Sequence, residues 1–131
     1  MNTDHLIAEA IKAIRVGDLY TIWKLKAKGL NLNFVSKDGL TILYFVIAFN
    51  RPELIPSLIG EGGVDVNKTL PGSESSPLMI ATRAGDKQMV EALLDAGADR
   101  DYENSLGVSA LSIAIEKHNY ELIELLSGSN V

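Results

Sequence analysis

The sequence contains no cysteine, and this absence removes several kinds of chemistry at once. There is no disulfide to staple the fold, no thiolate nucleophile and no sulfur ligand for a metal ion. The same absence fits a reducing compartment, and we expect a cytoplasmic protein. The first residues agree with this expectation, because Asp4, Glu9 and Lys12 interrupt any apolar segment that could serve as a secretory signal.

Long apolar runs and a surplus of positive charge are also lacking. The longest apolar stretch, residues 42–49, is much too short to span a membrane. The formal net charge is -5, and the densest cationic cluster consists of Lys26 and Lys28. Proteins that bind nucleic acids usually present a basic face. We therefore expect neither a membrane nor a nucleic acid as the partner.

Aromatic residues are scarce, at 6% of the chain, whereas hydrophobic residues make up 47%, so aliphatic side chains must form the core. These residues recur with a fixed period. Leucines that precede a glycine turn, at positions 25, 58, 93 and 126, follow one another at steps of 33, 35 and 33 residues. Two further ladders share the period: Leu43, Leu78 and Leu111, and Asn33, Asn67 and Asp101. Such a period indicates a repeat protein.

Each period contains the signals of two helices. Thr41, Ser76 and Ser109 each lie two residues before a leucine, where their hydroxyl groups can cap a first helix. That helix ends near Gly85 or His118, and a second helix with apolar residues at helical spacing follows. A glycine then ends the second helix, at position 29, at 62 or 63, and at 97. One such helix pair cannot bury its apolar faces alone, so neighbouring pairs must stack.

The segment SPLMIATRAGDKQMVEALLDAGAD, Ser76–Asp99, resembles the ankyrin motif, and residues 13–33, 38–43 and 107–111 resemble parts of it. The resemblance implies an all-α ankyrin-repeat solenoid, in which short hairpin-like loops join the stacked helix-turn-helix repeats. We expect one domain over residues 1–131, with repeats at about 4–33, 34–67, 68–101 and 102–131. The first and last repeats are expected to act as caps, without a separate domain or linker.

The second repeat departs most from this motif, because six bulky apolar residues fall within ten positions: Leu40, Ile42, Tyr44, Phe45, Ile47 and Phe49. Two interpretations are open, either filling of a loosely matched core or an interface. We interpret Ile42 and Phe45 as core residues. For Leu40 and Phe49 we favour a binding role, because the resemblance places them at variable positions that face the concave groove of the family.

Two further departures concern the backbone. Pro56 is expected inside the second helix of the second repeat, where a proline removes a hydrogen bond and costs about 3 kcal/mol unless it is accommodated. We interpret it as a tolerated kink. The link from Gly60 to Pro77 is two residues longer than its counterparts, and its tip near Gly72 is expected to be mobile. This tip is either a specificity element or a neutral insertion.

No constellation of residues predicts an enzyme, a cofactor or a metal site. His5 and His118 fall in the first and last repeats, and neither has a metal-ligand spacing to another histidine. Asp99 and Asp101 resemble a carboxylate pair. The matching positions of the first repeat hold asparagines, however, so we interpret both aspartates as turn-capping residues.

The family resemblance therefore implies a non-enzymatic adaptor or inhibitor that is a monomer when unbound and binds one protein partner through its concave groove. A toxin-blocking immunity protein would be one concrete version. The alternative is a structural module that self-associates through residues 42–49 or through Leu6, Ile7 and Ile11. The residues that the resemblance places in the groove are Arg15, Val16, Lys37, Asp38, Leu40, Ala48, Phe49, Ser73, Ser75, Arg83, Ala84, Ser105, Leu106, Val108, Glu116 and Lys117.

Overall fold

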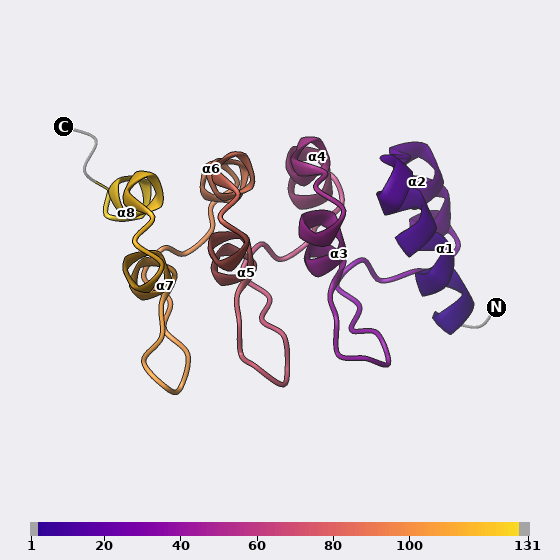
Figure 1. The fold of residues 1–131 in the computed structure, drawn as a ribbon. Coiled ribbons are helices and arrows are strands. Elements are labelled where there is room, and N and C mark those ends of the chain that lie inside the picture. The colour runs from indigo at the N-terminus through magenta and orange to yellow at the C-terminus, as the bar shows by residue number, and fades with distance from the viewer. Residues whose placement is uncertain (1–2, 129–131) are drawn as a thin grey trace.

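The fold is an array of helix pairs, seen in the computed structural model, which describes residues 3–128. The helices are α1 (Thr3–Val16), α2 (Leu19–Ala27), α3 (Ile42–Ala48), the 3-10 helix η1 (Pro52–Leu54), α4 (Ile55–Gly60), α5 (Pro77–Ala84), α6 (Lys87–Asp95), α7 (Ala110–Glu116) and α8 (Tyr120–Leu126). The pairs stand side by side in chain order (Figure 1). Hairpin loops project from the layer of α3, α5 and α7, and the second helices form another layer (Figure 1). The predicted all-α repeat fold is confirmed.

Hydroxyl caps begin the first helices, as the sequence predicted. The side chain of Thr41 accepts a hydrogen bond from the backbone N–H of Tyr44, and Ser76 and Ser109 do the same at α5 and α7. Each cap satisfies one of the N–H groups that a helix start leaves without a partner. The three caps therefore fix where α3, α5 and α7 begin.

The turn between the two helices of each pair needs one residue in the left-handed backbone conformation. These residues are Gly17, Asn50, Gly85 and His118, with φ angles of 75°, 56°, 71° and 55°. They follow the same period as the leucine ladder. The turn role predicted for His118 is confirmed, and the repeat holds a histidine where two others have glycine.

The kink predicted at Pro56 is confirmed as an interruption of the second helix, but Pro56 does not lie in a helix interior. The second helix of this pair is divided into η1 and α4, and Pro56 is the second residue of α4. At that position a missing N–H breaks no helical hydrogen bond, so the cost expected inside a helix does not apply. The other second helices begin at a capping side chain, from Asp18, Asp86 or Asn119, whereas Arg51 provides none to η1.

The link after α4 contains one glycine more than its counterparts. Gly63 has a φ of 69° and so matches the turn glycines at positions 29 and 97. Gly62 is instead buried, and its N–H donates to the carbonyl oxygen of Ser57, five residues earlier. Gly62 is therefore the residue that widens this turn.

One aliphatic core runs through the array. Ile42 is buried, and Phe45 packs against the core, in line with the core role predicted for both. Leu6 and Ile7, two of the residues considered for self-association, are buried against the rest of the array, whereas Ile11 is half-buried. Within residues 3–128, no helix is both long and apolar enough to cross a membrane.

Candidate protein-binding surface

The residues predicted for the groove lie at the C-terminal ends of the first helices and on the hairpin loops. We call this set, as given above, the hairpin-side surface. The first helices stack in chain order, α1 on α3, α3 on α5 and α5 on α7. Their C-terminal ends therefore form a row that begins at Arg15 and Val16 and ends at Glu116 and Lys117.

Most of the hairpin-side surface is open to solvent. Val16 is 65% exposed and Leu106 is 85% exposed, although both side chains are apolar. Leu40, Phe49 and Val108 are half-buried. The remaining exposed members are Arg15, Lys37, Asp38, Ala48, Ser73, Arg83, Ala84, Ser105, Glu116 and Lys117. The surface thus combines apolar positions with charges of both signs.

Phe49 connects the first two repeats. Its ring stacks on Phe45, with the ring centroids 6.2 Å apart, and packs against the core. The guanidinium carbon of Arg15 lies 5.1 Å from the Phe49 centroid, within the range of a cation–π contact. Arg51 also joins the first two repeats, because its guanidinium donates two hydrogen bonds to the carbonyl oxygen of Arg15. Phe49 therefore contributes to packing and also borders the surface.

Ser75 differs from the rest of the predicted set because only 1% of it is exposed. Its hydroxyl accepts a hydrogen bond of 2.9 Å from Nη1 of Arg83. Arg83 itself remains exposed at the end of α5. Ser75 thus positions a surface arginine and offers almost no surface of its own.

The longer hairpin of the third repeat is joined to the hairpin of the fourth repeat. Glu74, which adopts a φ of 57°, accepts hydrogen bonds on Oε1 from the hydroxyl and the backbone N–H of Ser105, at 2.6 and 2.9 Å. Its backbone oxygen accepts a further bond from the hydroxyl of Tyr102. The two hydrogen bonds from Ser105 to the carboxylate, that of the hydroxyl first, lower the pKa of Glu74 below its ordinary value. The tip that we expected to be mobile is thus linked to its neighbour.

A ladder of turn side chains connects successive repeats. Asn33 accepts a hydrogen bond of 2.7 Å from the N–H of Asp65 and donates one of 3.0 Å to the carbonyl oxygen of Gly63. Asn67 accepts one of 2.8 Å from the N–H of Asp99. Asp99 in turn caps the N–H of Asp101. The predicted capping role of Asp99 is thus confirmed, and no catalytic carboxylate pair is needed to explain these residues.

Two exposed apolar residues were missed by the sequence reasoning. Ile115 on α7 is 52% exposed, and Val35 on the second hairpin is 41% exposed. Ile115 occupies the repeat position of Ile14, Ile47 and Thr82, which are buried because the next first helix covers them. Only the shared period could have identified this position from the sequence.

Nothing in the described residues forms a metal centre. Residues 3–128 contain no group of three or more histidine, aspartate or glutamate side chains that could hold a metal ion. His5 lies in α1, and His118 lies between α7 and α8, in the first and last pairs of the array. These features describe a scaffold of stacked helix pairs that presents a row of loops and helix ends.

Comparison with known proteins identifies the scaffold. A family model for ankyrin repeats in three copies matches residues 43–131. The human ankyrin repeat and SOCS box protein 6 is 34% identical over 106 residues, which cover 75% of this chain. The chain belongs to the ankyrin-repeat family, whose repeats are protein–protein interaction modules.

Other relatives carry such repeats in different settings. A probable E3 ubiquitin-protein ligase of rice, XBOS34, is 32% identical over 118 residues, or 88% of this chain and 23% of that protein. The putative ankyrin repeat protein L371 of Acanthamoeba polyphaga mimivirus is 27% identical over 107 residues, or 79% of this chain and 14% of that protein. The chain spans about a quarter of the human relative, at 25% of its length.

Proposed function

We propose that this chain is a non-enzymatic adaptor or inhibitor that binds one protein partner through the hairpin-side surface. The observation that carries the proposal is the pair of exposed apolar side chains, Val16 and Leu106, set among exposed charges of both signs. Val16 ends α1 and Leu106 lies on the hairpin of the fourth repeat, so the two are separate apolar positions on a polar surface. Protein interfaces combine apolar contacts with a polar rim. We further propose a cytoplasmic site of action.

The exposed residues Val16 and Leu106 and the half-buried Phe49 would contribute differently to such an interface. Interfaces concentrate their binding energy in a few anchors that become buried on association. Val16 and Leu106 can become buried without any change of the fold, because they are already outside the core. Phe49 has less area to offer, and its substitution would also disturb the packing with Phe45. The exposed pair is therefore the better site for a test.

The test is affinity capture from an extract of the organism that encodes the chain, with quantitative mass spectrometry. We expect a protein that binds the wild type to be depleted at least about tenfold by Val16→Asp combined with Leu106→Asp, because each aspartate would have to be desolvated. The control is Tyr20→Asp with Tyr120→Asp, two residues 72% and 75% exposed on the second helices. Loss with the control and retention with the first variant would contradict the proposal.

Self-association is the second candidate, and the burial pattern does not favour it. Of the residues that this candidate would use, Leu6, Ile7, Ile42 and Ile47 are buried within the array, and Ile11 is half-buried against the core. We expect sedimentation of the purified chain to show a monomer at all concentrations. A stable dimer would instead support the assembly role.

A further inference from the structure

A groove lies between α4 and α6, in the layer of second helices and away from the hairpin loops (Figure 1). Its deepest part is an open pocket of about 470 Å³ lined by Pro56, Ile59, Gly60, Ala92, Asp95 and Ala96. An adjoining pocket of about 330 Å³ shares Ala92 and Asp95 and extends the groove along η1. We call the two together the α4–α6 groove.

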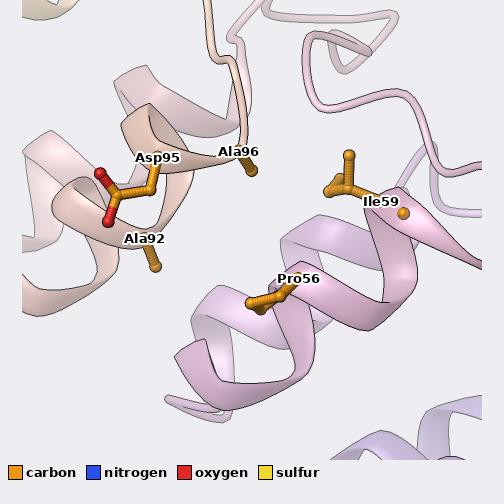
Figure 2. Close-up of a pocket in the computed structure, with 6 residues that line it drawn as sticks. Pro56, Ile59, Ala92, Asp95 and Ala96 are labelled. Carbon is orange, nitrogen blue, oxygen red and sulfur yellow. The ribbon is translucent and has the colours of Figure 1, made fainter.

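The sequence explains why this groove is open. Pro56 and Gly60 of α4 occupy the same positions in the repeat as Glu91 and Asp95 of α6. At these positions α4 therefore has small, uncharged residues where α6 has acidic ones. The facing residues of α6 are alanines. Figure 2 shows Ala92 and Ala96 pointing across the gap toward Pro56 and Ile59, with no side chain among those drawn filling the space between them. The floor of the groove is therefore apolar.

The charged residues that line the groove are all acidic: Glu53, Glu91 and Asp95. Arg51 pairs with Glu53 at a distance of 3.5 Å. Glu91 and Asp95 are exposed, and their carboxylates form no ion pair or hydrogen bond with any residue in the described part of the chain. The carboxylate of Asp95 turns away from Pro56 and Ile59, so it borders the apolar floor (Figure 2).

The placement of these two carboxylates is unfavourable for the isolated chain. Glu91 and Asp95 are four residues apart on one helix, so their like charges repel. Asp95 is also the last residue of α6, where the helix dipole disfavours a negative charge. A cation bound beside the C-terminal end of α6 would offset both unfavourable charge interactions.

We propose that the α4–α6 groove binds a basic, amphipathic segment of a second protein, with an aliphatic or aromatic side chain inserted between Pro56 and Ala92 and lysine or arginine beside Glu91 and Asp95. The volume is within the range of pockets that enclose a large side chain or small ligand. Acidic borders select cations, and the apolar floor supplies the contact area. This site is separate from the hairpin-side surface, so one chain can hold two proteins.

The test uses a defined probe, a synthetic helical peptide of leucine and lysine about three turns long, and its counterpart with glutamate in place of lysine. Amide chemical shifts of the intact chain are followed by two-dimensional NMR during titration. We expect the lysine peptide, and not the glutamate peptide, to shift the amides of residues 57–60 and 91–96. Absence of these shifts, or shifts confined to the hairpin loops, would overturn the proposal.

Charge-reversal variants separate a specific site from general attraction to an acidic protein. Glu91→Lys with Asp95→Lys is expected to weaken peptide binding at least about tenfold, because two attractions become repulsions. The matched control, Asp101→Lys with Glu103→Lys, makes the same change in net charge at exposed positions outside both surfaces and is expected to alter affinity less than about twofold. Equal losses in both variants would refute a built site, as would a dimer of the chain itself that the groove variant abolishes.

Discussion

Three glycines within four residues give the sharpest test of the backbone assignment, because each requires glycine to a different degree. Gly60 is the last residue of α4, and a Cβ added there meets no atom within 4 Å. Gly63 has open space as well, but its φ of 69° is left-handed. A Cβ on Gly62 would lie 2.5 Å from the carbonyl oxygen of Leu58 and 3.2 Å from Cδ1 of Leu32.

The three alanine variants should therefore differ in sign and size. Gly60→Ala should stabilise the chain by about 0.5–1 kcal/mol, because alanine loses less backbone entropy in a helix. Gly63→Ala should cost about 1 kcal/mol, because an L-residue is strained in the left-handed region. Gly62→Ala should cost about 2–3 kcal/mol, because the backbone of the turn must move to admit the methyl group.

The assay is urea unfolding followed by circular dichroism and by the fluorescence of Trp23, together with thermal melting. For a chain of this size, about 1 kcal/mol corresponds to roughly 4 °C in Tm. Gly60→Ala and Gly62→Ala should thus melt roughly 10 °C or more apart. The reasoning is refuted if Gly62→Ala is as stable as the wild type, or if Gly60→Ala destabilises as much as Gly63→Ala.

Two further predictions concern the hydrogen bonds between repeats. Asn33→Ala should lower the free energy of unfolding by about 1–2 kcal/mol, because it removes two inter-repeat hydrogen bonds. Asn67→Ala removes one such bond and should cost about 1 kcal/mol. Urea midpoints that do not show this order would contradict the prediction. Glu74→Gln should reduce acid sensitivity: the lowered pKa of Glu74 adds stability above its unfolded value of about 4.3, and this stability is lost as pH falls through the folded pKa. Unfolding midpoints from pH 7 to pH 3 should therefore fall less steeply in the variant, and parallel curves would exclude the effect.

Features set by neighbouring residues in the chain were predictable from the sequence. The caps at Thr41, Ser76 and Ser109 follow from the preference of hydroxyl side chains for helix starts. The left-handed role of His118 follows from its place in the period. The division of the second helix at Pro56 could have been anticipated too, because Arg51 stands where the other repeats have aspartate or asparagine.

Features that depend on contacts between separate elements were not predictable in the same way. Ser75 follows a polar tip in the sequence, yet it is buried because Arg83 covers it from the next helix. The link between Glu74 and Ser105 joins two hairpins that are 31 residues apart in the chain. The α4–α6 groove likewise requires small residues on two helices to face each other. No local sequence pattern predicts which helix faces contact each other.

The position shared by Ile14, Ile47, Thr82 and Ile115 shows how stacking decides what a residue does. The same place in the repeat is buried in the first three pairs and half-exposed in the last, because no further first helix follows α7 within the described residues. An apolar side chain there stabilises an internal repeat by about 1.5–3 kcal/mol. At α7 the equivalent side chain, Ile115, instead keeps about half of its surface exposed. A residue of this fold is therefore core or surface according to its neighbour, and the exposure of Ile115 follows from its place in the last described pair.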